Sequence, residues 1–318
     1  MTKARQLADL GNAYDDGALS NRNLIINGGL LCWQRGTSHS VSGGIVYTAD
    51  RFWKYSPSVS GTYERSTDAP DGFAYSMHYN VDGSTAGSGT TVEFSRQGYF
   101  PQGQYTFSFY VKGDLTNTNL GIGFRNTVGS GTDQVNFSPI TNYGNYTEWT
   151  RVVRTFTINL APHANNKFLN LEFAGMPAGV KFTGVQLEVG DTATPFEHSK
   201  SYGDELAKCQ RYFWSLDSNG VSNKYLGQGA NYTASACYAH FPFPNEMRAT
   251  PTLTPSDVTH FQVVENGSVK DASGVTLSGS ITNQGALVIF SASVGQGNGS
   301  LIRTDGNTNV YLWFDAEL

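Results

Sequence analysis

Apolar and polar residues alternate along most of the chain between residues 23 and 197. The segments QYTFSFYVKG (104–113), EWTRVVRTFTI (148–158) and FLNLEF (168–173) each place apolar side chains at about every second position. Successive side chains of a strand point to opposite faces, so this period indicates strands with one buried face. Clusters of Gly, Asn, Asp and Ser separate the segments, as at 80–90. The pattern predicts an antiparallel β-sandwich.

One helical pattern follows the predicted sandwich. Ser201 and Asp204 lie three residues apart and form a start signal similar to a capping box. Spacings of four, three and four residues then place four apolar side chains on one stripe: Tyr202, Leu206, Cys209 and Phe213. Such a stripe packs on a neighbouring sheet or, at this coiled-coil spacing, against copies of itself around a threefold axis. Both interpretations remain open, and the second predicts a helical neck at 199–214.

The strand pattern returns after Trp214 and continues to the last residue. It is clearest in the final segment, where the two faces carry Val310, Leu312, Phe314 and Ala316 on one side and Tyr311, Trp313, Asp315 and Glu317 on the other. Alternation of this kind is typical of a strand with one face in a core. We therefore predict a second small β-sandwich domain at 215–318.

The first 22 residues differ from the rest of the chain. Residues 2–10 have the pattern of a short amphipathic helix, and a polar, turn-rich linker follows it. Isolated helices shorter than about 12–15 residues are marginal in water. We therefore expect this peptide to order against another protein, with Ala4, Leu7 and Leu10 as its contacting residues.

Composition narrows the class of protein. Only 15% of the residues are charged and 13% are aromatic, and the chain contains 36 glycine residues. This composition favours many turns between short strands. The net charge is −5, and residues 215–318 carry four basic and eight acidic side chains, a balance of −4. Binding to nucleic acid by bulk electrostatics is therefore not expected. No apolar run approaches the roughly 20 residues that span a bilayer, so we expect synthesis in the cytoplasm and no membrane insertion.

Motifs for chemistry are not evident. The three cysteines are scattered, the six histidines form no HxH or HxxxH pair, and no nucleophile or phosphate-binding motif occurs. Asp315 and Glu317 project from one face of one strand at about 7 Å, but this spacing is generic for alternate strand residues. We expect neither an enzyme nor a metal or other cofactor.

The order of separated segments points to a family. NLIINGGLLCWQRGTS (23–38), YTADRFW (47–53) and GVQLEVGDTATPFE (184–197) resemble a jelly-roll module of bacteriophage tail-fibre proteins. The segments 104–113 and 148–158 are similar to core strands of jelly-roll carbohydrate-binding modules. SYGDELAKCQRYFW (201–214) and FPFPNEMRATPTLT (241–254) resemble the helix and the FP-x-x-MR-x-x-P segment that follow this module in many phage fibres. MTKARQLADLGN (1–12) is similar to their N-terminal attachment peptide.

This resemblance implies an all-β homotrimer with four parts. Residues 1–22 would anchor the chain to a phage tail or adaptor protein through 1–20, 23–198 would form a jelly-roll shaft, 199–214 a neck, and 215–318 a receptor-binding β domain. The chain would be a phage tail fibre that belongs to the virion, is made in the host cytoplasm and attaches to host surface polysaccharide. Related jelly rolls often hold Ca²⁺ with two acidic residues. Here Gly29, Leu30 and Leu31 replace one of them and only Glu188 remains, so no metal is expected.

Sugar binding requires flat aromatic rings together with carboxylates or amides. The candidate receptor residues are Tyr311, Trp313, Asp315, Tyr238 and His260. For Trp313, a place in a trimer interface is the alternative, whereas Trp33, Trp53 and Trp149 are expected in the core. Two other functions remain open: a structural head fibre or decoration protein without a receptor, and a glycan-cleaving enzyme. For Arg248 of the FP-x-x-MR segment, two interpretations remain open: an ion pair with a carboxylate of a neighbouring strand or subunit, or a side chain in solvent.

Overall fold

The computed structural model describes residues 22–40, 43–56, 60–81, 87–94, 100–126, 128, 135–136, 143–159, 161, 166–199 and 201–318. The chain divides into two compact units, Met1–Tyr202 together with Leu318, and Gly203–Glu317. We call these the N-terminal unit and the C-terminal unit. The predicted anchor residues Ala4, Leu7 and Leu10 lie outside the described residues. No helix in the described ranges is both long enough and apolar enough to cross a membrane.

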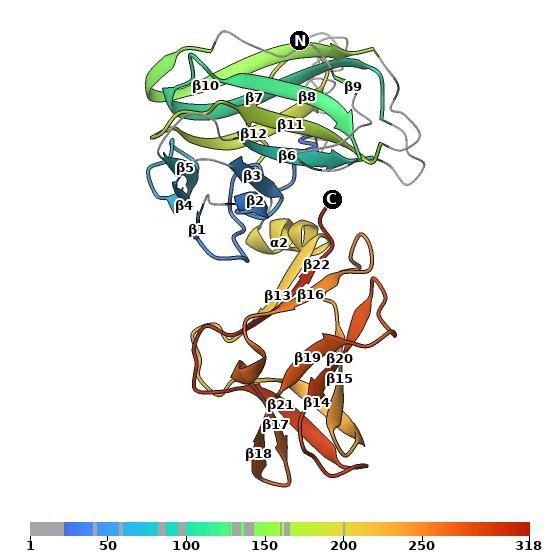
Figure 1. The fold of residues 1–318 in the computed structure, drawn as a ribbon. Helices are drawn as coiled ribbons and strands as arrows, with labels where there is room; N and C mark the ends of the chain where they lie inside the picture. The colour runs from blue at the N-terminus through green and yellow to red at the C-terminus, as the bar shows by residue number, and fades with distance from the viewer. Residues whose placement is uncertain are drawn as a thin grey trace, which may run out of the picture. The chain divides into compact units, whose positions relative to one another are not determined.

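The N-terminal unit is a sandwich of two six-stranded antiparallel sheets (Figure 1), as the alternation predicted. One sheet has the order β1-β4-β5-β12-β7-β10 and the other β2-β3-β6-β11-β8-β9. The strands are β1 (Ser38–Ser40), β2 (Gly43–Tyr47), β3 (Phe52–Ser56), β4 (Gly61–Ser66), β5 (Ser76–Val81), β6 (Gly87–Glu93), β7 (Gly103–Asp114), β8 (Asn119–Arg125), β9 (Val135–Asn136), β10 (Asn145–Ile158), β11 (Phe168–Ala174) and β12 (Lys181–Val189). The all-β fold class and the jelly-roll-like sandwich are confirmed.

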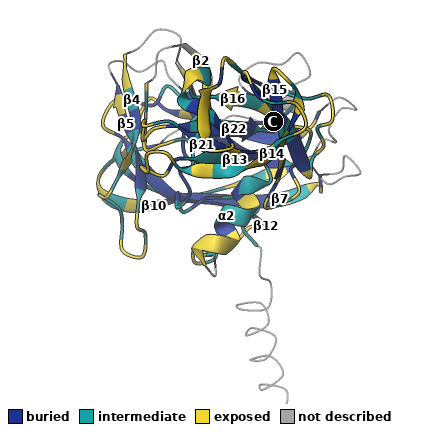
Figure 2. Cartoon of the chain, turned by 90° about the horizontal axis from the view of Figure 1, so that it is seen from below, coloured by how far each residue is buried: buried dark blue, intermediate teal, exposed yellow. Residues whose placement is uncertain are grey.

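Aromatic side chains fill the space between these two sheets. Phe107 and Phe109 of β7 are buried, and the Phe109 ring meets the Phe173 ring of β11 at 4.9 Å between centroids. Figure 2 marks such buried positions in dark blue. The predicted core positions of Trp33 and Trp53 are confirmed as buried.

The core prediction for Trp149 is wrong. Its side chain is half-buried and donates from Nε1 to Oδ1 of Asp68 at 3.0 Å. The prediction rested on the place of Trp149 in a recognised strand segment. Along β10, Trp149 is on the same face as Arg151 and the exposed Val153, opposite to the face that carries the buried Val152.

The C-terminal unit contains one helix and two antiparallel sheets, and the predicted second small sandwich is confirmed. One sheet has three strands in the order β13-β22-β16, and the other has seven in the order β18-β17-β21-β14-β15-β20-β19. The elements are α2 (Tyr202–Gln210), β13 (Phe213–Asp217), β14 (Tyr225–Thr233), β15 (Ala236–Pro242), β16 (Thr252–Pro255), η1 (Val258–His260), β17 (Phe261–Glu265), β18 (Ser268–Asp271), β19 (Gly274–Leu277), β20 (Gly285–Ser291), β21 (Gly299–Thr304) and β22 (Tyr311–Asp315).

One core joins the two sheets of this unit. Leu312 and Phe314 of β22 and the flanking Val310 and Ala316 are buried in it, as the alternation of the final segment predicted. The Trp214 ring stacks on the Phe314 ring at 5.2 Å and 20°. The opposite face of β22 therefore carries Tyr311, Trp313 and Asp315.

The predicted helical stripe is wrong at its last residue. α2 ends at Gln210, and Phe213 is the first residue of β13, where it pairs with Asp315 of β22. Tyr202, Leu206 and Cys209 lie on the helix, but Phe213 does not, so the four residues form no continuous helical face. The end of the predicted 199–214 neck is thus part of a sheet, in which the backbone of β13 pairs with β22.

Arg248 also differs from the prediction. Its guanidinium donates to the backbone carbonyls of Ala316 at 2.9 Å and Glu317 at 3.0 Å. The preceding Met247 is buried in the core. The FP-x-x-MR segment therefore fixes the end of the final strand through carbonyl oxygens and does not form the predicted ion pair.

Candidate functional site

The side of the three-stranded sheet that faces away from the core carries a group of aromatic and polar residues. Trp313 at the centre lies opposite Ser215 of β13 and Thr254 of β16. Residues that are opposite each other on paired strands share a face. The complete group, which we call the aromatic face, consists of Phe213, Ser215, Asp217, Thr252, Thr254, Tyr311, Trp313 and Asp315.

Two rings dominate the aromatic face. Tyr311 and Trp313 stack with centroids 4.0 Å apart and planes inclined by 13°. Phe213 meets Trp313 edge to face, at 5.7 Å and 68°. Tyr311 and Trp313 are both half-buried, so each offers part of its ring to solvent. In a face-to-face stack each ring covers one face of the other, so the pair presents ring edges and an outer ring face to a sugar or to another protein surface.

Polar groups border these rings. Asp217 accepts from Ser215 Oγ at 3.3 Å and from the backbone N–H of Asn219 at 2.9 Å. Asp315 accepts from the backbone N–H of Glu317 at 2.9 Å, and Thr252 and Thr254 are exposed. Two oriented carboxylates and several hydroxyls therefore lie beside an apolar surface, a combination that binds polyhydroxylated ligands.

The other two predicted receptor residues lie elsewhere in the C-terminal unit. Tyr238 is on β15 of the seven-stranded sheet, where its ring is 5.1 Å from that of the exposed Tyr232. His260 ends the short η1 helix between the two sheets, and its Nε2 is 3.3 Å from Nδ2 of Asn307. The structure therefore brings Tyr311, Trp313 and Asp315 together but does not put Tyr238 on the same sheet.

Sequence reasoning missed the polar half of the aromatic face. Ser215 and Asp217 precede Trp313 by almost 100 positions in the chain, and Thr252 and Thr254 come from a third segment. Their proximity depends on the register of β13 and β16 against β22. Alternation within one segment cannot give this register.

In the N-terminal unit, the sequence also missed a charged cluster around Asp68. Lys181 donates to Oδ2 of this carboxylate at 2.6 Å, Lys112 reaches the same atom at 3.4 Å, and Trp149 binds Oδ1. The hydrogen bonds from Lys181 and then Trp149, with a smaller effect of the positive charges of Lys181 and Lys112, lower the pKa of Asp68 to about 2. The cluster ties the loop after β4 to three strands of one sheet, which is a structural role.

A second polar group of the N-terminal unit lies on β11 and β8. Glu172 forms an ion pair with Arg125 at 3.2 Å and accepts a hydrogen bond from Asn170 Nδ2 at 3.4 Å. The side chain of Asn170 is fully buried. Glu188, the one residue retained from the metal-binding pattern, accepts hydrogen bonds from the backbone N–H and the hydroxyl of Thr194.

No protein-family model and no curated protein sequence matches the chain. Among solved structures, the C-terminal family 22 carbohydrate-binding module of Clostridium thermocellum Xyn10B is 14% identical, over 48% of this chain and 97% of that chain, with a TM-score of 0.31. The enzymatically active domain of bacteriophage CBA120 tailspike protein 4 is 14% identical, over 53% and 21%, also with a TM-score of 0.31. TmCBM61 in complex with β-1,4-galactotriose is 13% identical, over 54% and 100%, with a TM-score of 0.28. At these scores the likeness identifies neither a ligand nor a reaction for this chain.

Proposed function

We propose that this chain is a non-enzymatic phage tail fibre that attaches the virion to a host surface glycan through its C-terminal unit. The observation that carries the proposal is the stacked Tyr311–Trp313 pair on the aromatic face. Asp217 and Asp315 supply carboxylate oxygens at the edges of this pair. The order of fibre-like segments in the sequence supports the same assignment.

The chemistry of a sugar ring matches this surface. A pyranose presents C–H groups on its faces and hydroxyls around its edge. The outer parts of the two aromatic rings can contact the C–H groups, and the flanking carboxylates can accept hydrogen bonds from the hydroxyls. An aromatic contact contributes about 0.5–1.5 kcal/mol beyond its buried area, and a hydrogen bond to a charged acceptor about 1.5–3 kcal/mol. Single sites are therefore weak. A homotrimer and several fibres per virion raise the overall affinity through effective concentration.

The remaining parts of the chain serve this attachment in the proposal. The sandwich at 23–198 is a spacer, and residues 1–20 bind a tail or adaptor protein of the virion. The described residues of the sandwich form their own core, so we expect it to fold without the C-terminal unit. A structural head fibre or decoration protein would share this architecture and differ only in lacking receptor binding.

Catalysis is not part of the proposal. A glycosidase needs two carboxyl groups that face each other across the scissile bond at about 5–9.5 Å. Asp315 accepts the backbone N–H of Glu317, which is typical of a residue that closes a strand end. Release of reducing ends from host polysaccharide by the purified protein would contradict this part of the proposal.

Replacement of Trp313 by alanine in the full chain tests the proposal. We expect binding of the labelled protein to host cells to fall by at least tenfold while its mass in light scattering is unchanged. Tyr232→Ala, which removes an exposed ring from the other sheet, is the matched control and should bind like wild type. Loss of the oligomer before loss of binding would instead assign Trp313 to a subunit interface.

A further inference from the structure

A row of four side chains crosses the outer face of the seven-stranded sheet. Arg303 of β21 lies opposite Tyr225 of β14 on one side and opposite Gln262 of β17 on the other, and Gln262 lies opposite Asp271 of β18. The core side of these strands is occupied by their alternate residues, such as Phe261 and Ile302. The four side chains of the row therefore point away from the core.

Hydrogen bonds fix the orientation of Arg303 within this row. Gln262 donates from Nε2 to Oδ1 of Asp271 at 2.8 Å, which turns its Oε1 atom towards Arg303. Arg303 then donates from Nε to that Oε1 atom at 2.9 Å. The Nε contact leaves the two terminal nitrogens of the guanidinium available as a fork, the geometry that binds a carboxylate with two parallel hydrogen bonds.

The other basic residues of 215–318 are in different situations. Lys224 donates to the carbonyl of Asp217 at 2.7 Å, and both Arg248 contacts are to carbonyls of the chain end. Lys270 is exposed on β18. Arg303 is half-buried, held in one orientation, and beside the Tyr225 side chain, which is 54% exposed. A carboxylate at Arg303 would therefore place the attached ring next to a tyrosine.

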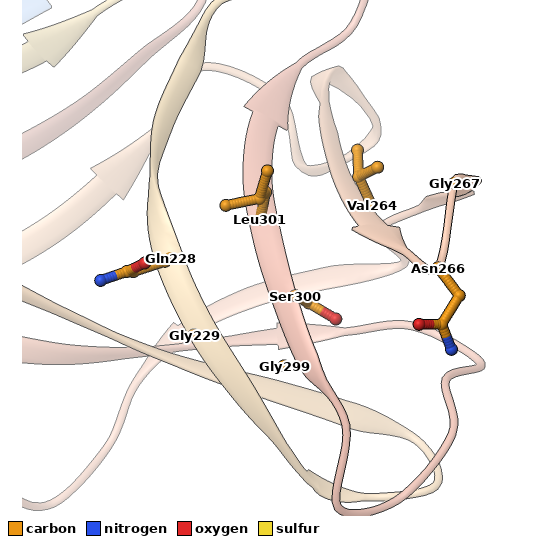
Figure 3. A pocket seen from close by; sticks show the side chains of 8 residues that line it. All are labelled: Gln228, Gly229, Val264, Asn266, Gly267, Gly299, Ser300 and Leu301. Carbon is orange, nitrogen blue, oxygen red and sulfur yellow. The ribbon is translucent and has the colours of Figure 1, made fainter.

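A hollow continues from this row along the same strands. It has a volume of about 560 Å³ and is lined by Gln228, Gly229, Val264, Asn266, Gly267, Gly299, Ser300 and Leu301. Leu301 and Val264 each lie two residues from a member of the row, about 7 Å along the strand. Figure 3 shows Gln228 and Leu301 leaning to one side of the sheet and Ser300 to the other. The volume is in the range of small-ligand sites.

We propose that this surface binds an acidic sugar, of the uronic or sialic acid class, with its carboxylate on Arg303 and its ring against Tyr225. The adjoining residue of the polysaccharide would occupy the hollow, where Leu301 and Val264 face its C–H groups and Gln228 and Asn266 its hydroxyls. Gln262 and Asp271 are positioning residues that aim the guanidinium. The inference rests on the proposed glycan-binding function and adds a second site on the same unit.

Saturation-transfer NMR on the full-length protein tests this assignment. The probes are sodium D-glucuronate, D-galacturonate and N-acetylneuraminate, each compared with neutral D-glucose and D-galactose. We expect at least one acidic sugar to bind at least tenfold more tightly than both neutral sugars. Arg303→Gln should remove this preference, and Arg303→Lys should not restore it, because an ammonium group lacks the fork.

Lys270→Gln is the matched control, because it removes one positive charge from a strand of the same sheet. It should keep the preference for the acidic sugar. The inference would be overturned if neutral and acidic sugars bound equally or if no acidic sugar bound. It would also be overturned if the Arg303 and Lys270 variants lost the preference for the acidic sugar to the same extent. Circular dichroism of each variant identifies unfolding. Gln262→Ala provides a second test, because it removes the hydrogen bond that orients Arg303 without changing the charge. The proposed function fails separately, if Trp313→Ala leaves host-cell binding intact.

Discussion

Lys181 donates from Nζ to Oδ2 of Asp68 across 2.6 Å and so connects β12 to the loop that follows β4. This contact and the hydrogen bond from Trp149 lower the pKa of the Asp68 carboxyl to about 2, from an ordinary value of 3.8. A carboxylate whose pKa is lower in the folded state stabilises the fold above its unfolded pKa. That stabilisation is lost as the pH falls from 3.8 towards 2.

Asp68→Asn should therefore destabilise the protein in a pH-dependent way. Because the side chain is 37% exposed, solvent screening reduces the effect to roughly 1 kcal/mol at pH 7. The difference in unfolding free energy from wild type, measured by urea titration, should shrink between pH 4 and pH 2. Lys181→Gln should reproduce most of the loss at pH 7. An unchanged difference at pH 2 would contradict the ion-pair explanation.

Replacement of Lys54 should change the unfolding free energy in the opposite direction. Its side chain is fully buried, its Nζ has no hydrogen-bond partner, and burial lowers its pKa to about 8 from 10.5. At pH 7 the folded protein bears the cost of a buried charge. Lys54→Met should raise the unfolding free energy by about 1–3 kcal/mol.

The pH dependence checks the origin of that gain. Between pH 8 and 10.5 the unfolded chain keeps the proton that the folded chain releases, so wild-type stability rises relative to the variant. The gain in unfolding free energy of Lys54→Met over wild type should thus decline above pH 8 and be absent near pH 10.5. Lys270→Met, at an exposed lysine, should show no such trend. A gain independent of pH would indicate better packing alone.

Oligomeric state is a third prediction. The 34.5 kDa chain should have about three times that mass in light scattering. Leu206 lies half-buried on α2, so Leu206→Asp should weaken association without unfolding the sheets, because an unpaired charge at an interface is costly. Phe213→Asp is unsuitable as a test, since β13 would be disturbed directly. A wild-type monomer at micromolar concentration would exclude the trimer.

The proposed role of residues 1–20 in attachment gives a fourth prediction. Removal of residues 1–20 should leave a soluble, folded protein, because the core residues of both units in the described part of the chain all come from later positions. The shortened protein should no longer join virions when it is supplied during infection by a phage that lacks the gene. Incorporation into particles at the wild-type level would place the attachment site elsewhere.

The sequence predicted features that depend on neighbouring residues. The burial of Leu312 and Phe314 followed from alternation along a single strand. Phe213 was assigned to the helix because its spacing from Cys209 fits a helical face, but the local spacing contained no information about pairing with Asp315. Long-range strand pairing determined the structure there.

Relationships across strands were beyond prediction for the same reason. Tyr225 and Arg303 are 78 positions apart and become neighbours only through the β14–β21 register. Arg248 was expected to pair with a carboxylate or to lie in solvent, yet it donates to the carbonyls of Ala316 and Glu317. Side-chain type gives the chemistry of a residue, whereas the fold decides which partner it meets.

Competition with infection tests the central claim most directly. Each unit is compact and has its own core, so fragments 23–198 and 199–318 can be prepared separately and added to host cells before the phage. The account predicts that fragment 199–318 reduces infection in proportion to its concentration, that its Trp313→Ala form does so at least tenfold less well, and that fragment 23–198 has no effect. Protection by fragment 23–198 and none by 199–318 would contradict the assignment of the receptor site to the C-terminal unit.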